Sequence, residues 1–287
     1  MPPSNLQADI RVKSIFHPTD LSEASEIAFF HALKLALIAK AEFGMLHVPA
    51  ESGASWKSFP GVRDTLTRWN ILPEGSPEEA VRRLGIKVRK LMAAGSDPLE
   101  ASLKYLERHP ADLIVLAVHQ QQGRMGWMDK PVGKPMARAA GEMTLFIPHG
   151  VEGFVSRRDG AVSLRNILIP LASIPNPQPA IETAARLIYN LQLPAGIVTL
   201  LHAGTPDSTP AVRLPEGTGW TWSRVTRSGA PDQAILQAAD ELGADLIIMT
   251  SEGPDGFLDA LRGSTSERVL RTTRCPLLNI PVGSRLG

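Results

Sequence analysis

Glycine and hydroxyl residues near the end of the chain have the types and spacing that could hold a phosphate. Gly253 is followed, after nine further residues, by Gly263 and Ser264. A short apolar run at 246–249 precedes them and is typical of a buried strand, whereas residues 266–271 indicate a helix. Small residues let backbone N–H groups approach an anion, and the first turn of a helix has unpaired N–H donors. This order of strand, glycine loop and helix predicts a phosphate-sized site.

A second loop with the same glycine spacing lies in the first half of the chain. Its glycines are Gly123, Gly126 and Gly133, and Lys134 stands where the later loop has its serine. A lysine ammonium can neutralise phosphate charge directly. This loop is therefore predicted to bind an anion through the charge of Lys134, which takes the place of the motif's hydroxyl. For both loops, a purely structural glycine turn is the alternative.

The order of elements restarts halfway along the chain. The segment KSIFHP at 13–18 is followed in the second half by RNILIP at 165–170, and ADLIV at 111–115 by ADLII at 244–248. A repeat of this length indicates two copies of a whole domain. Strands that alternate with helices predict an α/β fold whose parallel sheet is covered on both faces. The expected boundaries are 1–150 for the first domain, 151–162 for the linker and 163–287 for the second domain.

The two copies differ between their second and third strands. This stretch spans 48 residues in the first copy (47–95) and 27 in the second (202–229). The second copy is therefore predicted to lack a crossover helix, which leaves one face of a parallel sheet uncovered. Trp220 and Trp222 lie in the shortened stretch, and we expect them to pack over that face.

Composition excludes several classes of protein. The chain has 30 basic and 29 acidic residues and a net charge of +1, so no basic surface for nucleic acid or an anionic membrane is expected. One cysteine allows no internal disulfide, which fits a reducing compartment. The start of the chain lacks the apolar core of a signal peptide, and no apolar stretch is long enough to span a bilayer. We therefore expect a soluble cytoplasmic protein that binds neither nucleic acid nor a membrane.

The glycine loop of the second half, with the strand CPLLNI (275–280) after it, resembles the C-terminal half of a universal stress protein domain. ATP-binding members of that family carry G-x-x-G-x9-G-(S/T). Thr250 and Ala117 replace the first glycine of this motif in the second and first halves. The resemblance extends over most of residues 13–282 and implies two tandem flavodoxin-like (adenine nucleotide α-hydrolase-like), doubly wound domains.

The resemblance also implies ATP or another adenine nucleotide as the ligand, with magnesium expected only as a companion of the nucleotide. In nucleotide-binding members an aspartate at the position of Asp20 contacts the nucleoside, and the backbone near Val48 helps to hold it. In the second half Ala172 stands at the position of that aspartate. The residues expected to bind a nucleotide are Asp20, Val48, Gly123, Gly126, Gly133, Lys134, Gly253, Gly263 and Ser264.

Two other chemistries are weaker alternatives. Asp20, His47 and His119 could meet at one edge of the sheet as a metal site, but no close-spaced His or Cys pair supports it, so we expect no metal site. Cys275 has arginines nearby in the sequence, which could lower the pKa of its thiol. A buried structural cysteine is the favoured interpretation.

The resemblance favours a binding or regulatory module of the stress response over a fast enzyme, and no catalytic residue is assigned. A slow nucleotide hydrolase at the Asp20 edge and a ligand-free protein-interaction module remain alternatives, and the protein partner is unknown. The closing strands at 144–147 and 277–280 should lie at the edges of their sheets. Unpaired edges invite pairing, so we expect the halves to form an intramolecular pseudo-dimer; further homodimerisation is left open.

Overall fold

The computed structural model describes residues 12–49, 56–94, 97–118, 142–217, 219–252 and 265–283. The first half contains β1 (Ser14–Pro18), α1 (Glu23–Ala39), β2 (Glu42–His47), the 3-10 helix η2 (Trp56–Ser58), α2 (Val62–Arg68), α3 (Glu78–Arg83), β3 (Lys87–Met92), α4 (Pro98–Arg108), β4 (Leu113–Val118) and β5 (Met143–Pro148). The second contains β6 (Asn166–Leu171), α5 (Gln178–Asn190), β7 (Ile197–Ala203), the 3-10 helix η6 (Pro206–Ser208), β8 (Thr221–Arg227), α6 (Pro231–Leu242), β9 (Leu246–Ser251), α7 (Thr265–Thr272) and β10 (Leu277–Pro281).

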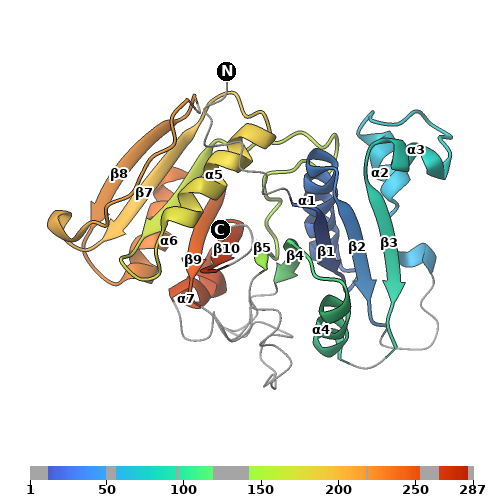
Figure 1. The fold of residues 1–287 in the computed structure, drawn as a ribbon, viewed down its shortest axis with the longest axis horizontal. Helices are drawn as coiled ribbons and strands as arrows, with labels where there is room; N and C mark the ends of the chain where they lie inside the picture. Colours follow the sequence, from blue (N-terminus) through green and yellow to red (C-terminus); the bar gives the residue numbers. More distant parts are fainter. Residues whose placement is uncertain are drawn as a thin grey trace.

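The strands form one sheet in the order β3-β2-β1-β4-β5-β10-β9-β6-β7-β8 (Figure 1). Each half alone has its strands in the doubly wound order, and all pairs within a half are parallel. β5 and β10 pair antiparallel, with Leu145 opposite Leu278 and Phe146 opposite Leu277. The predicted pairing of the halves through their closing strands is confirmed. The domain boundaries themselves stay a prediction.

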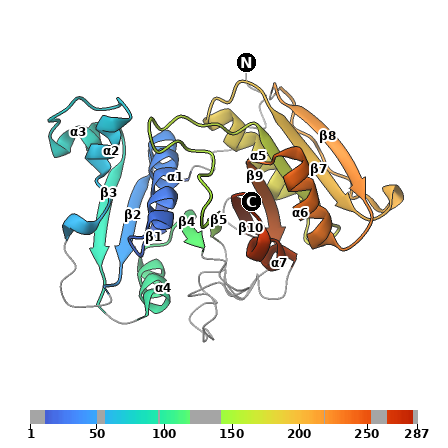
Figure 2. The same ribbon diagram turned by 180° about the vertical axis from the view of Figure 1, so that it is seen from behind.

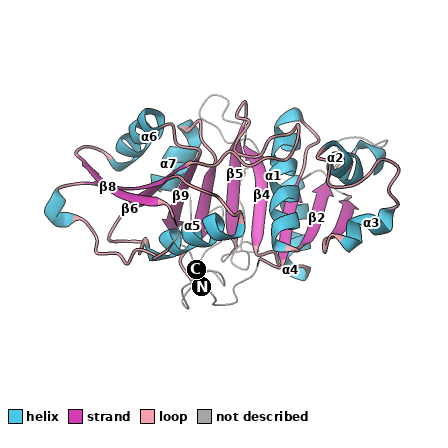
Figure 3. Cartoon of the chain, turned by 90° about the horizontal axis from the view of Figure 1, so that it is seen from above, coloured by secondary structure: helices cyan, strands magenta, loops and turns pink. Residues whose placement is uncertain are grey.

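Helices lie on both faces of the sheet. Central strands such as β4 and β9 are buried on both sides, whereas the edge strands β3 and β8 carry charged, partly exposed residues. Figure 1 shows α5 in front of the second half, and Figure 2 shows α6 and α7 on the opposite face. The view along the sheet in Figure 3 shows strands of both halves in one row. One hydrophobic cluster contains both Leu33 of α1 and Ile181 of α5, so this core continues across the β5–β10 pair. The prediction that helices lie on both faces of the sheet is confirmed.

The second half lacks a crossover α-helix between β7 and β8 in the part of that stretch that the structure describes. Only η6 lies there, where the first half has α2 and α3. Trp220 is buried in its place, and its indole Nε1 donates a hydrogen bond to the Leu193 carbonyl oxygen at 3.3 Å. Trp222 packs against the same core. Both tryptophans therefore contribute to the hydrophobic core, and their covering of the sheet face stays a prediction.

A repeated aspartate fixes the start of each half. The Asp112 carboxylate accepts hydrogen bonds from the backbone N–H groups of residues 13 and 14 at 2.7 and 2.9 Å. Asp245 accepts from residues 165 and 166 at 2.7 and 2.8 Å. In each copy the carboxylate joins the start of the fourth strand to the start of the first. The repeated ADLI sequence thus combines a buried strand with this anchor.

The connection between the halves is docked on α1 through His31. Its Nδ1 donates to the Ile27 carbonyl oxygen at 2.9 Å, and its Nε2 accepts the N–H groups of Phe154 and Val155 at 3.0 and 3.2 Å. The rings of His31 and Phe154 lie edge to face, with centroids 4.7 Å apart. Gly153 has a φ of +69°, and a Cβ there would lie 2.4 Å from Nε2. Only glycine fits this close approach, so the connection is held by specific contacts.

Buried histidines should make the fold sensitive to acid. Burial lowers the pKa of both His31 and His17 to about 4, from 6.5. Below pH 6.5 the unfolded chain binds protons at these rings more readily than the folded protein. We therefore expect the free energy of unfolding to fall between pH 6.5 and 4, by about 3 kcal/mol for each histidine. The change His31→Gln should remove the part of this pH-dependent loss that comes from His31. Urea unfolding near pH 7 and near pH 4.5 would measure the free energy of unfolding at both values.

The matched control for this experiment is Phe154→Leu. It removes the ring that contacts His31 but no titrating group, so it should lower the free energy of unfolding by a similar amount at both pH values. If His31→Gln kept the wild-type pH dependence, the histidine would not be the source of the acid sensitivity.

Candidate functional site

Two hydrogen bonds bring the loop after β1 to the end of β2. The N–H of Thr19 donates to the Leu46 carbonyl oxygen at 2.8 Å, and Nδ1 of His47 donates to the Thr19 carbonyl oxygen at 2.8 Å. Asp20 and Val48 directly follow these linked residues. Both therefore lie at the carboxyl edge of the first half, where ligands bind in doubly wound sheets.

The backbone at the start of α1 orients the Asp20 side chain. Its Oδ1 accepts the N–H of Ser22 at 2.9 Å, and Ser22 in turn caps α1 by accepting the N–H of Ser25 at 3.2 Å. The intervening Leu21 has a φ of +64°, which makes the chain turn sharply here. Asp20 is exposed. An ionised carboxylate is an acceptor for the hydroxyl or amino groups of a nucleoside.

The predicted phosphate-binding residues lie outside the described residues. They are Gly123, Gly126, Gly133, Lys134, Gly253, Gly263 and Ser264. The elements on either side of the second loop are described: β9 ends at Ser251, and α7 begins at Thr265. The strand and the helix of the predicted phosphate motif are therefore confirmed, while the contacts made by its loop stay a prediction.

A metal site was the alternative at this edge. Within the described ranges, no group of three His, Cys, Asp or Glu side chains is placed to hold a metal ion. Asp20 and His47 are described, whereas His119, the third member considered, lies outside those ranges. The ring of His47 is held by the Thr19 carbonyl oxygen.

The corresponding edge of the second half has a different chemistry. Nδ1 of His202 lies 3.2 Å from the Leu171 carbonyl oxygen, which repeats the link between His47 and Thr19. Ala172 follows Leu171 and offers only a methyl group. This histidine link was not predicted from the sequence. The signal for it was the Leu-His pair that ends the second strand of each copy.

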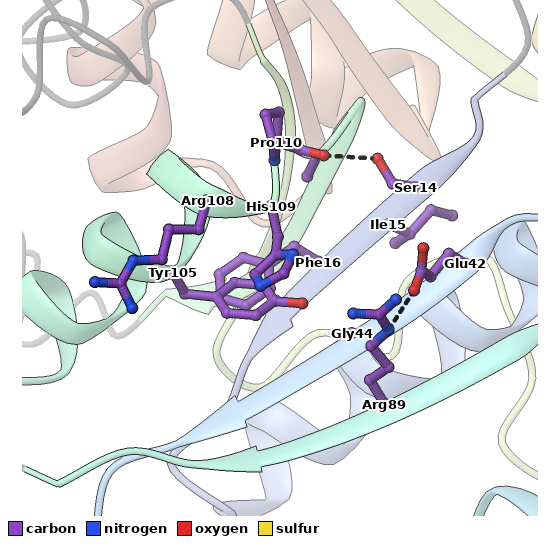
Figure 4. A pocket seen from close by; sticks show the side chains of 11 residues that line it. Ser14, Ile15, Phe16, Glu42, Gly44, Arg89, Tyr105, Arg108, His109 and Pro110 are labelled. Atoms are coloured by element: carbon purple, nitrogen blue, oxygen red, sulfur yellow. Dashed lines mark hydrogen bonds and ion pairs between the residues drawn. The ribbon is translucent and has the colours of Figure 1, made fainter.

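A pocket of about 230 Å³ lies at the opposite end of the sheet, among the starts of β1 and β2 and the end of α4 (Figure 4). Glu42 and Arg89 form an ion pair on its wall. The Tyr105 ring stacks on Phe16 with centroids 5.1 Å apart, and a Cβ on Gly44 would lie 3.1 Å from the Tyr105 hydroxyl. No sequence pattern predicted this pocket, which is remote from the edge that carries Asp20 and Val48.

Comparison with known proteins identifies the family. The model of the Universal stress protein family matches residues 11–148 and 216–281. The chain belongs to the universal stress protein family. The match includes β1 to β5 of the first half and, from β8 onward, the second half.

Individual relatives agree with this assignment. Universal stress protein MJ0531 of Methanocaldococcus jannaschii is 40% identical over 50 residues, which cover 17% of this chain and 29% of that protein. The crystal structure of a universal stress protein from Archaeoglobus fulgidus has 22% identity and a TM-score of 0.56, covering 93% of this chain and 97% of that one. Protein PA1789 of Pseudomonas aeruginosa, described as functionally unknown, has 13% identity and a TM-score of 0.58, covering 97% and 95%. These structures show a shared fold.

None of the helices in the described ranges is long and apolar enough to cross a membrane.

Cys275 is a buried structural residue, as the sequence analysis favoured. Only 6% of its surface is exposed, and burial raises the pKa of its thiol. The alternative of a lowered thiol pKa is therefore wrong, because desolvation outweighs any effect of the arginines nearby in the sequence.

The thiol should consequently be protected in the folded protein. We expect iodoacetamide to leave Cys275 unmodified under native conditions and to alkylate it fully in denaturant, because the thiolate is the reacting species. Mass spectrometry of the intact protein measures both, and the chain has only this cysteine. Alkylation at equal rates in native buffer and in denaturant would contradict the buried position.

Proposed function

We propose that this universal stress protein is a regulatory module that binds an adenine nucleotide weakly, in its first half. Membership of the family supports the class of function. The observation that carries the choice of site is the position of Asp20 and Val48, which the bonds between Thr19 and the end of β2 bring to one edge.

The two halves differ in what they offer a nucleoside. Asp20 presents an exposed carboxylate in the first half, whereas Ala172 at the equivalent position cannot accept a hydrogen bond through its side chain. Lys134 would contribute a positive charge for the phosphates of the first half. These differences favour the first half for occupancy.

Binding is proposed to be weak because the predicted motif is divided between the halves. The nucleoside-side residues Asp20 and Val48 belong to the first half, and the better-preserved phosphate loop, with Gly263 and Ser264, belongs to the second. A half that lacks one part of the motif loses the binding energy of that part. We propose a dissociation constant weaker than about 1 μM, which corresponds to about −8 kcal/mol.

Calorimetric titration of ATP and of AMP into wild type and Asp20→Ala tests the proposal. We expect Asp20→Ala to weaken the binding of both ligands by about tenfold or more, because the lost contact is to the nucleoside and a hydrogen bond to a charged group is worth about 1.5–3 kcal/mol. Asp20→Asn keeps the shape and an acceptor oxygen but removes the charge, so an intermediate loss is expected.

Two variants of the other half serve as matched controls. Gly263→Val should leave the affinity unchanged if the first half holds the ligand, and Ala172→Asp supplies the second half with the missing carboxylate. Loss of binding with Gly263→Val alone would reverse the choice of half. Loss with either Asp20→Ala or Gly263→Val would mean that the halves share one site. Steady ATP hydrolysis at about 1 per second or faster that Asp20→Ala abolishes would favour a hydrolase.

A further inference from the structure

A serine and a histidine form a hydrogen-bonded pair at the carboxyl edge of the second half. His202 lies near the end of β7, and Ser208 is the last residue of η6. The distance between Nε2 of His202 and Oγ of Ser208 is 2.8 Å. The imidazole is buried, whereas Ser208 is exposed. A reagent from solvent can therefore reach the serine while its histidine partner is held inside.

The contact of Nδ1, the second ring nitrogen of His202, indicates which ring nitrogen carries a proton. Nδ1 of His202 lies 3.2 Å from the Leu171 carbonyl oxygen, which can only accept a hydrogen bond. An imidazole that donates to this oxygen carries a proton on Nδ1, and with that single proton its Nε2 accepts. The Ser208 hydroxyl proton can then be donated to Nε2 or to the Thr205 carbonyl oxygen, 2.8 and 2.9 Å from Oγ. A hydroxyl that donates to an imidazole, with the imidazole oriented by a third group, is the arrangement of an activated nucleophile.

Local backbone geometry holds the pair together. The N–H and the hydroxyl of Thr205 donate to Oγ of Ser208 at 3.1 and 3.2 Å, and the Thr205 carbonyl oxygen, 2.9 Å away, is a second acceptor for the serine proton. A Cβ on Gly204 would lie 2.5 Å from Nε2 and 2.9 Å from Oγ. Only glycine leaves room for the contact at this position. The equivalent residue of the first half is Pro49, so the repeat does not require glycine here.

We propose that Ser208 is a nucleophile for activated acyl esters, with His202 as its general base. The Oγ attacks the ester carbonyl carbon, the bond to the leaving aryloxide breaks, and the serine proton passes to Nε2. An acyl serine and a free aryloxide result, and Nε2 then returns its proton to solvent or to the aryloxide. The adjacent Asp207 is exposed and negatively charged, which favours an uncharged acyl donor over an anionic phosphoryl donor. The site lies in the half that does not contain Asp20, so it is separate from the proposed nucleotide site.

The experiment uses the full chain and p-nitrophenyl acetate. We expect release of about one equivalent of p-nitrophenolate from a single reactive residue, and peptide mass spectrometry should locate the acetyl group on Ser208. Because mapping is done on the wild type, the result does not depend on a variant that fails to fold. Acetyl groups on lysines alone, with none on Ser208, would overturn the proposal.

Variants test whether His202 activates Ser208 or whether Ser208 reacts only because it is exposed. A general base contributes about 10²–10⁴-fold, so His202→Gln should slow acetylation of Ser208 by about 100-fold or more. Ser208→Ala should abolish the release of the one equivalent of p-nitrophenolate. Ser163→Ala, which removes another exposed serine, should leave that release unchanged. Thermal unfolding checks that each variant is folded. A folded His202→Gln variant that acetylates at the wild-type rate would show that the pair is only structural.

Discussion

The antiparallel pairing of β5 with β10 is the interaction on which the rest of the structure depends. Each half has an open sheet edge at its last strand, and an unpaired edge leaves backbone N–H and C=O groups without partners. The pairing satisfies both edges at once and places Leu145 opposite Leu278, both buried. It also makes one hydrophobic cluster continue through the two halves. A single ten-stranded sheet results.

Within that sheet the two halves share their scaffold and differ at their ligand edges. The aspartate anchors at 112 and 245 and the histidine-to-carbonyl links at 47 and 202 recur in both. Beyond these shared bonds, the first half presents Asp20, and the second presents Ser208 beside its histidine. The repeated bonds fix the positions of the strand ends, and this leaves the residues just after the strands free to take on different chemistry.

Much of the fold could be predicted from the sequence because its signals are local or repeated. Apolar runs indicated the buried strands, the internal repeat indicated two copies, and the short stretch before Trp220 indicated the missing helix. The meeting of Asp20 and Val48 followed from the rule that parallel strands end at one edge. The contact between His31 and Phe154 could not be predicted, because the two residues are 123 positions apart and depend on the path of the connection. The pair of His202 and Ser208 depends on the path that brings the η6 turn back to the end of β7.

The docked connection has a consequence for how the protein responds to dilution. Two separate domains would associate only above a concentration set by their dissociation constant. A short tether held against α1 at His31 gives the second half an effective concentration near the first that is independent of how much protein is present. The paired arrangement should therefore persist at a few copies per cell as well as at high abundance. A change in expression level would then alter the number of assembled molecules but not the fraction assembled.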